Sequence, residues 1–290
     1  MNKYNVTNNN KYHCNFLPKI SIVMTYYERL HQIKNTLNSF KKYINNEFEV
    51  IIIDDGSEFS LNNIINDFDY SITLVEMDKY SKNYYNSCVP FNIGFSFIRG
   101  EITIIQNAEC LHYTNIFQEI YKSNLFKFYI SFSCYSLSRE DTNEFSNQTS
   151  QVHFKNISAT KDGESAWYNH EKYRPTGYHF CSAILTKHLK NLNGFDIRYA
   201  MGIGYDDDEL LYRIKENELK LIINNNGIVL HQWHYTNKNY DKNLVNRNRF
   251  LFKFITKKKY SYFIFKILSK KIIFDRTIID IFFHYKDKYL

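Results

Sequence analysis

Four short apolar runs, each rich in β-branched residues, mark the first part of the chain. They are Lys19–Met24, Glu49–Ile53, Ile72–Glu76 and Glu101–Ile105. Such runs are typical of strands that are buried on both faces of a parallel sheet. Apolar residues at helical spacing predict an amphipathic helix over residues 28–44, and shorter helices are expected over 61–68 and 91–98. Strands and helices therefore alternate, which predicts an α/β protein with a largely parallel sheet.

The alternation is less regular after about residue 110. The pattern there predicts, in chain order, a helix over 112–122, a strand over 128–136, a long polar loop over 140–164, helices over 185–192 and 208–217, and strands over 219–223 and 228–231. We divide the chain into a flexible N-terminus (1–17), one domain (18–235, with halves 18–109 and 110–235) and a basic, aromatic helical tail (236–290).

Composition narrows the class of protein. The 290 residues are 44% hydrophobic and 18% aromatic, enough for a substantial core and against wholesale disorder. The net charge of +7 is spread along the chain, so we do not expect nucleic-acid binding. The 5 cysteines form no CxxC pair, which argues against a zinc ribbon or a disulfide framework. The start of the chain lacks the apolar core of a signal peptide, and no run reaches membrane-spanning length, so we expect a cytoplasmic protein.

Polar side chains follow three of the predicted strands. They are Thr25, Tyr26 and Glu28 after the first, Asp54 and Asp55 after the second, and Asn107 and Glu109 after the fourth. Ligands of open α/β sheets bind at the carboxyl ends of the strands, so these groups predict a binding site at that edge. Taken alone, Asp-Asp-Gly-Ser is also an ordinary turn and helix-capping sequence.

Two further groups suit a divalent cation. Asn107 and Glu109 are two residues apart, a spacing that directs both oxygen-bearing side chains to one side. His231 and His234 follow another predicted strand, and we expect one of the two imidazoles to complete the site. The alternative is a histidine pair that lines the core or the surface.

Four consecutive acids, Asp206 to Glu209, stand at the start of a predicted helix, after Gly202 and Gly204. Mutual repulsion makes this run costly unless a cation, a helix N-terminus or a substrate hydroxyl engages it. A charged helix cap is the structural reading, but the glycines permit close backbone approach and favour a site. Trp167, Tyr168 and His179 offer faces on which a sugar ring could stack, or else belong to the core.

Six segments in this order resemble the GT-A-fold glycosyltransferases of the family-2 type. They are SIVMTYYER (21–29), EVIIIDDGS (49–57), FNIGFSFIRGE (91–101), ITIIQNAE (102–109), NGFDIRYAMGIGYDDDELLYR (193–213) and VLHQWH (229–234). The last two also resemble the C-terminal motif of galactosyltransferase-like and chondroitin-polymerase-like domains. The resemblance covers roughly residues 18–235 and implies a GT-A fold. That fold has a single Rossmann-like, mostly parallel sheet flanked by helices, with an acceptor-side subdomain, here followed by the helical tail.

The resemblance implies a role for each matching residue. The donor nucleotide would contact Thr25, Tyr26, Glu28, Asp54, Asp55, Asn92, Gly94, Arg99, Gln106 and Asn107. Mn²⁺ or Mg²⁺ would be held by Glu109 with Asn107, His231 and His234. The catalytic pair would be Asp206 and Asp207, with Asp207 as general base. The acceptor or sugar side would include Trp167, Tyr168, His179, Gly202, Gly204 and Asp208.

The family's Asp-x-Asp metal motif is replaced here by Asn-Ala-Glu, so the motif carries one charge fewer. We interpret the chain as an inverting enzyme that moves a sugar from a nucleotide-diphosphate sugar, a UDP-sugar favoured, to a glycan, glycolipid or protein-linked acceptor. The alternative is a catalytically inactive sugar- or nucleotide-binding module of the same fold. Residues 250–290 mix Lys with aromatic residues, which suits either peripheral membrane contact or a helix packed on the domain.

Overall fold

Four parallel strands form the centre of the sheet in the computed structural model, which describes residues 4–9, 17–44, 47–146, 151–236 and 240–257. Across the sheet they stand in the order β4 (Ser71–Met77), β3 (Phe48–Asp54), β2 (Ile20–Tyr26) and β5 (Ile102–Asn107). All of β3 and nearly all of β2 and β4 are buried, as the continuous apolar runs predict.

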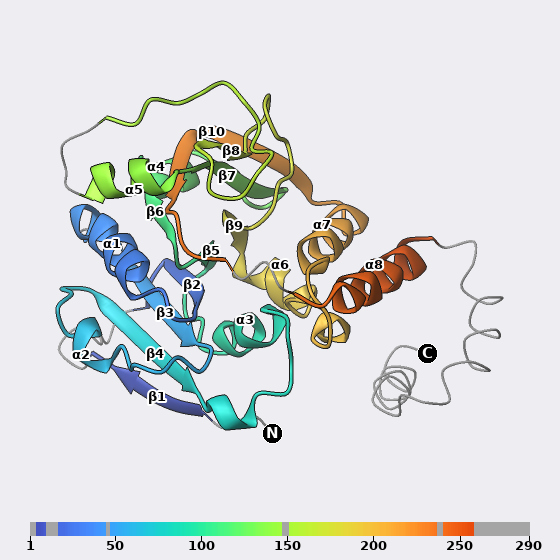
Figure 1. The fold of residues 1–290 in the computed structure, drawn as a ribbon, viewed down its shortest axis with the longest axis horizontal. Coiled ribbons are helices and arrows are strands. Elements are labelled where there is room, and N and C mark those ends of the chain that lie inside the picture. The colour runs from blue at the N-terminus through green and yellow to red at the C-terminus, as the bar shows by residue number, and fades with distance from the viewer. Residues whose placement is uncertain (1–3, 10–16, 45–46, 147–150, 237–239, 258–290) are drawn as a thin grey trace.

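The sheet continues on both sides of this centre with antiparallel neighbours (Figure 1). Beyond β5 the order is β9 (Cys181–Leu185), β7 (Phe128–Ser136), β10 (Lys220–His231) and β6 (Cys110–His112), and β7 and β10 run parallel to each other. Two shorter strands complete it: β8 (Ala166–Asn169) pairs with β7, and β1 (Tyr4–Asn8) pairs with β4 at the opposite edge. The α/β class with a mostly parallel central sheet is confirmed.

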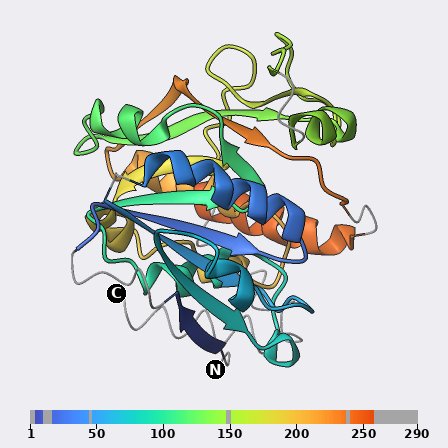
Figure 2. The ribbon, with the colours of Figure 1, turned by 90° about the vertical axis from the view of Figure 1, so that its left-hand side faces the viewer.

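Helices cover both faces of the sheet (Figures 1 and 2). On one face α1 (Leu30–Phe40), α2 (Asn62–Ile65) and α4 (Ile116–Tyr121) share a core with alternate residues of β2 and β3. On the other face α3 (Cys88–Phe95), α6 (Thr186–Asn191) and α7 (Asp206–Glu216) pack against the intervening residues. A third, smaller core lies around Trp167 and Tyr135, near α5 (Arg139–Ser146). Short 3-10 turns occur at Lys41–Tyr43, Lys79–Ser81 and Ile197–Tyr199.

Three expectations about the elements are wrong. Residues 4–9 are not a loose lead-in, because β1 pairs with β4 and the buried Asn9 side chain bonds the carbonyl of Tyr70 at 2.8 Å and the amide of Ile72 at 2.8 Å. The polar segment 140–164 is not all loop, since α5 occupies its start. The strands predicted over 219–223 and 228–231 are one strand, β10, whose register shifts between Asn224 and Ile228.

The predicted tail begins with a helix that belongs to the fold. Helix α8 (Lys242–Thr256) packs beside α7, and its Asn248 is fully buried (Figure 1). Asn248 donates hydrogen bonds to the carbonyls of Tyr199 at 3.0 Å and Gly204 at 2.9 Å. Residues 258–290, which hold most of the predicted tail, lie outside the described part of the chain. Among the helices that are described, none combines the length and the apolar character needed to cross a membrane.

Candidate active site

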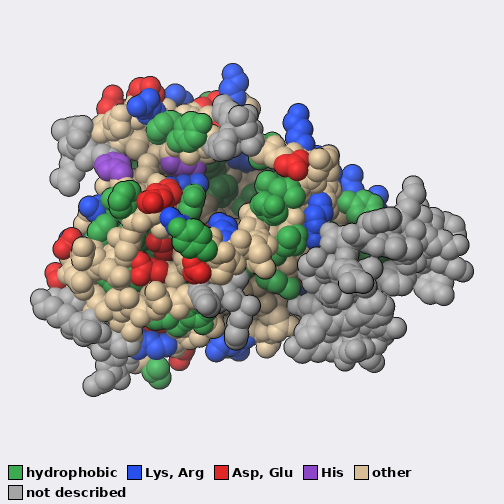
Figure 3. Space-filling view, turned by 60° about the horizontal axis from the view of Figure 1, so that its bottom comes forward, with side chains coloured by type: hydrophobic (Ala, Val, Ile, Leu, Met, Phe, Trp, Pro, Cys, Tyr) green, Lys and Arg blue, Asp and Glu red, His purple; other side chains and the backbone are tan. Residues whose placement is uncertain are grey.

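The strand register brings the predicted motifs to one edge of the sheet. Tyr26 is paired with Asp54, and Thr25 with Asn107, so the carboxyl ends of β2, β3 and β5 are level. The chain turns directly after β5 through Ala108 and Glu109 into β6. Figure 3 shows a face on which histidine, acidic and basic side chains lie close together around a hollow.

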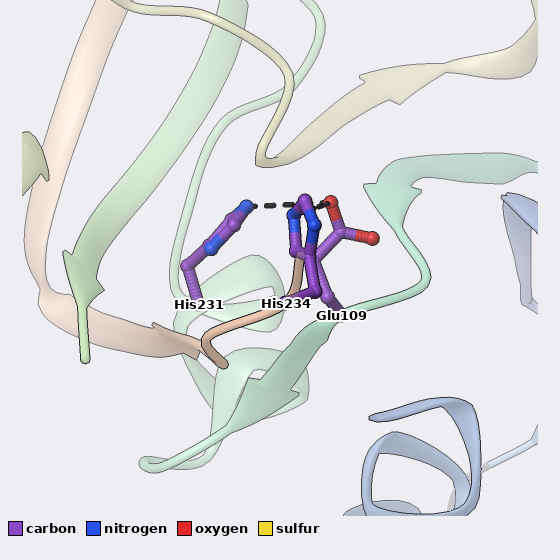
Figure 4. Close-up of side chains that lie close together, drawn as sticks. All are labelled: Glu109, His231 and His234. Atoms are coloured by element: carbon purple, nitrogen blue, oxygen red, sulfur yellow. Dashed lines mark ion pairs between the residues drawn. The ribbon is translucent and has the colours of Figure 1, made fainter. Parts of the chain in front are cut away.

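A carboxylate and two imidazoles converge at this edge (Figure 4). Glu109 Oε1 lies 3.3 Å from His231 Nε2 and 3.5 Å from His234 Nε2, and the three ligand atoms lie within 4.8 Å of one another. Both histidines point to the same oxygen, whereas the sequence predicts only one there. His234 Nδ1 lies 3.1 Å from the carbonyl of Tyr235, which can only accept; in the tautomer that donates to this carbonyl, Nε2 is able to bind a metal.

Glu109 is buried yet carries its charge. Burial alone would raise the pKa of its carboxyl, but Arg29 and hydrogen bonds from His231 and His234 outweigh burial and hold the pKa well below its usual value. The Arg29 guanidinium lies 2.7 Å from Oε1, the oxygen that faces the histidines. A cation is thus already part of the site, which the sequence motifs do not reveal.

Gln232, between the two histidines, fixes their position. Its side chain is buried, accepts from Asn35 at 2.8 Å and donates to the carbonyl of Glu109 at 3.0 Å. The neighbouring Trp233 carbonyl accepts from Gln32 of α1 at 2.8 Å. The strand end after β10 is therefore tied both to α1 and to the turn that carries Glu109.

The two residues before Ala108 face opposite ways, as strand geometry requires. Gln106 is fully buried and bonds the Cys110 carbonyl at 2.6 Å and His112 Nε2 at 2.9 Å. It therefore belongs to the core, not to a nucleotide site. Asn107 is partly exposed at the end of β5, in register with Thr25.

The four acids begin α7, and each has its own partner. The buried Asp206 accepts from Asn86 at 3.0 Å, Asp208 accepts from the Tyr178 hydroxyl at 2.9 Å, and Glu209 pairs with Arg213. Burial, and then the adjacent Asp207, raise the pKa of Asp206. The side chain of the fourth acid, Asp207, is 31% exposed.

Asp207 is paired with His179, whose Nδ1 contacts its Oδ1. Burial would lower the pKa of His179, but the Asp207 carboxylate outweighs it and raises the pKa. The next residue, Phe180, packs its ring 6.1 Å from that of His231 and accepts from the Asn107 amide at 3.1 Å. The short segment 178–180 thus joins the acids of α7 to the Glu109–histidine cluster.

The loops after β2 and β3 are linked to each other. Asp54 is buried and accepts from the Ser57 amide at 2.8 Å, while Ser57 Oγ accepts from the Glu28 amide at 3.1 Å. Burial, with smaller effects from Glu76 and Glu28, raises the pKa of Asp54 to about 6. Asp54 lines a pocket of about 450 Å³. Asp55 is engaged by Lys82 at 2.6 Å and by the Tyr84 hydroxyl.

Several predicted donor or acceptor contacts lie elsewhere. Arg99 pairs with Glu49 at 2.6 Å, at the amino end of the strands, away from Asp54. Asn92 is bound on both sides to the backbone of Phe195, and Gly94 is required where α3 touches Ile53. Trp167 is core, stacked 5.2 Å from Phe154, and is not an acceptor surface.

The glycines before α7 have a packing role. A Cβ on Gly202 would lie 2.3 Å from Asn248 Oδ1, so α8 can approach only a glycine there. Gly204 has a φ of +67°, open space around its Cα, and a carbonyl that accepts from both Asn248 and Asn86. Tyr205 also has a positive φ, of 66°. The turn that presents Asp206 and Asp207 is therefore held from α8, which the sequence patterns do not indicate.

A second pocket, the aromatic pocket, has a volume of about 390 Å³ and lies beside the histidine pair. It is lined by Ser136, Leu137, Asp162, Gly163, Tyr168, Arg174, Phe180, His231, Trp233, His234, Tyr235 and Thr236. The rings of Tyr168 and His231 meet edge to face at 5.0 Å. Of the predicted acceptor aromatics, Tyr168 lies in this pocket.

Comparison with known proteins identifies the family. A profile of glycosyl transferase family 2 matches residues 21–189, which is more than half of the chain. The chain belongs to glycosyl transferase family 2. The match includes Glu109 and the loops after β2 and β3, but it ends before Asp207 and His231. The resemblance of residues 193–213 and 229–234 to galactosyltransferase-like domains stays a prediction. A search of curated proteins finds no match.

Solved structures of similar shape agree with the family. Residues 1–349 of TarS from S. aureus, in complex with UDP-GlcNAc, match with 12% identity and a TM-score of 0.58, over 80% of this chain and 65% of that one. The same TarS fragment without a named ligand matches with 12% identity and a TM-score of 0.53, over 74% and 60%. Mannosyltransferase PcManGT from Pyrobaculum calidifontis, with GDP-Man and Mn²⁺, has 16% identity, a TM-score of 0.48 and coverage of 78% and 59%.

The family-2 chain thus spans less than two thirds of these proteins. The TarS likeness confirms the fold, which is that of GT-A glycosyltransferases.

Proposed function

We propose that the chain is an inverting glycosyltransferase that moves a sugar from a nucleotide-diphosphate sugar to a hydroxyl of a glycan, glycolipid or protein-linked acceptor. The observation that carries the proposal is the convergence of Glu109, His231 and His234 at the carboxyl edge of the sheet. The acids of α7 lie one short segment away, joined to the cluster through His179 and Phe180.

The convergent side chains fit a divalent metal ion. One carboxylate and two imidazoles provide ligands that Mn²⁺ accepts, whereas Mg²⁺ prefers oxygen, so we favour Mn²⁺ of the two. Glu109, His231 and His234 would hold the ion, which supplies positive charge for the leaving diphosphate when it is bound. Arg29 adds a second cation next to Glu109, and its guanidinium suits a phosphate oxygen.

Asp207 is the proposed general base. Its carboxylate takes the proton of the acceptor hydroxyl, whose oxygen then attacks the anomeric carbon while the bond to the diphosphate oxygen breaks. Asp206 and Asp208 are occupied by Asn86 and Tyr178, and His179 orients the Asp207 carboxylate. An attacking oxygen on the face opposite the diphosphate gives inversion.

The donor nucleotide would lie over the loops after β2 and β3, next to Asp54 and Asp55. We favour a UDP-sugar, which is supported by TarS complexes with UDP-GlcNAc and with UDP. The catalytically inactive binding module remains the competing function, favoured by Asn107 in place of an acid and by Arg29 on Glu109.

The test uses the full chain with UDP-, GDP-, dTDP- and CDP-sugars, each with Mn²⁺ or with EDTA. A bound nucleotide at about 100 times its Kd should stabilise the fold by roughly 2.7 kcal/mol. We expect one nucleotide to raise the melting temperature only with Mn²⁺, and its sugar to be released or transferred. A thermal shift without any turnover would identify the binding module instead.

Asp207→Asn should abolish sugar transfer while the thermal shift with the nucleotide persists, because the variant loses the proton acceptor and the proposed nucleotide contacts lie on the loops after β2 and β3. The matched control is Glu216→Gln, at the exposed far end of the same helix, which should transfer sugar at the wild-type rate. Equal activity of Asp207→Asn and this control would refute the assignment of the base.

A further inference from the structure

Arg174 has no carboxylate partner among the residues that the structure describes. Four other arginines each pair with an acid: Arg29, Arg99, Arg198 and Arg213. Arg174 is also partly buried, yet within the described residues its side chain forms no ion pair. The guanidinium keeps partial access to water and lies over the Tyr168 ring, so its N–H donors are available to an anion that binds beside it.

The position of Arg174 ties it to the cluster at the sheet edge. Its guanidinium lies over the Tyr168 ring, 5.5 Å from the ring centroid. The Tyr168 ring in turn contacts the His231 ring, with centroids 5.0 Å apart. Arg174, Tyr168 and both histidines line the aromatic pocket. The acid that lines the same pocket, Asp162, is exposed and not paired with Arg174 within the described chain.

The walls of the pocket suit a sugar ring. Its volume of about 390 Å³ falls within the roughly 300–1,000 Å³ of small-molecule sites. Tyr168, Phe180 and Trp233 line it with aromatic rings, and the rings of Tyr168 and Phe180 are stacked with centroids 5.5 Å apart. Aromatic side chains are the kind of surface against which pyranose rings pack. Gly163, with a φ of +81°, lets the loop before β8 approach Trp233 so closely that a Cβ would lie 3.0 Å from its Nε1. The loop before β8 and the segment that carries Trp233 therefore form this wall by approaching each other closely.

We propose that the aromatic pocket is the acceptor subsite and that it selects an acceptor sugar carrying an anionic group, a carboxylate or a phosphate, which pairs with Arg174. The ring of the acceptor lies against the aromatic walls, and the anion neutralises the guanidinium. The role of the bound sugar as acceptor rests on the proposed function, but the binding of an anionic sugar does not depend on turnover.

The experiment measures binding of small sugars to the full chain by saturation-transfer NMR, without any donor. The probes are methyl β-D-glucuronide and glucose 6-phosphate, with methyl β-D-glucoside as the neutral counterpart. We expect at least one anionic probe to bind about tenfold tighter than the glucoside, the factor of a charge-assisted hydrogen bond. Arg174→Gln should remove that difference, and Arg174→Lys should keep part of it. Lys172→Gln, an exposed change two residues away, should leave binding unchanged.

Two results would overturn the proposal: equal binding of all three probes to the wild-type chain, or anionic binding that survives Arg174→Gln in a variant with an unchanged melting temperature. If UDP or GDP displaces the anionic probe and Arg174→Gln weakens the nucleotide, the anion is the diphosphate of the donor and the acceptor assignment is wrong. If the chain binds the anionic sugar through Arg174 but turns over no nucleotide-sugar, the subsite proposal stands and the proposed transferase function is wrong.

Discussion

Asn248 offers a sharp test of how α8 supports the site. Asn248→Ala removes three hydrogen bonds: one donated to the buried Tyr199 carbonyl, one donated to the more accessible Gly204 carbonyl, and one accepted from the Arg247 guanidinium. The loss is about 1–1.5 kcal/mol for each of the two bonds to a carbonyl, plus about 1 kcal/mol for the carbonyl left buried, while Arg247 keeps its bond to the Arg198 carbonyl. The better helix propensity of Ala returns about 0.5 kcal/mol, so the expected net loss is about 2.5–3.5 kcal/mol.

That loss predicts a melting temperature lower by roughly 5–14 °C, at about 2–4 °C per kcal/mol for a chain of this size. The same variant frees the turn before Asp206, so the rate of sugar transfer should fall more than nucleotide binding does. Asn246→Ala is the control, because Asn246 is exposed on the same helix and gains the same propensity. If both variants melt within about 1 °C of each other, α8 does not hold the turn as described.

Three further results are expected. Arg29→Gln should bind Mn²⁺ several-fold more tightly in a calorimetric titration, because the guanidinium that competes for Glu109 is gone; weaker binding would mean that Arg29 assists the ion. Asp54 has a pKa of about 6, above its unfolded value of 3.8, so its ionisation destabilises the fold as the pH rises from about 4 to 6. Asp54→Asn should flatten the loss of unfolding free energy over that window, measured by urea titration, and an unchanged slope would contradict the shift. Gly202→Ala should be as destabilising as Asn248→Ala in the same melting assay, since its Cβ would collide with that side chain.

The central sheet could be predicted because burial on both faces leaves a continuous apolar run. Strand β1 could not, since it lies at an edge with Tyr4 and Val6 exposed, so its pairing with β4 has no apolar signature. Strand β9 was missed because five residues lead directly into α6 with no turn sequence between them. Both strands are specified by neighbours distant in sequence.

The site could be predicted where a motif follows a strand. Glu109 lies just beyond β5, as its sequence position indicates, and both histidines meet it there, where the sequence predicts one. The prediction for Arg99 was wrong. Arg99 stands just before a parallel strand, and a residue in that position lies at the amino edge of the sheet, opposite the site. Gln106 was misplaced because alternation along a strand turns it inward when Asn107 faces out. Arg29 joins the site through tertiary packing, which no local pattern reports.

The hydrogen bond from Gln32 to Trp233 spans 201 residues of sequence, and it closes the site across the molecule. A ribosome releases the parallel strands β2 to β5 long before it has made the histidines of β10 or the helix that holds the Asp207 turn. Chain closure over such a span is slow and entropically costly, so the sheet can form first while the site forms last. During synthesis, the growing polypeptide is therefore partly folded for a time before its site is assembled.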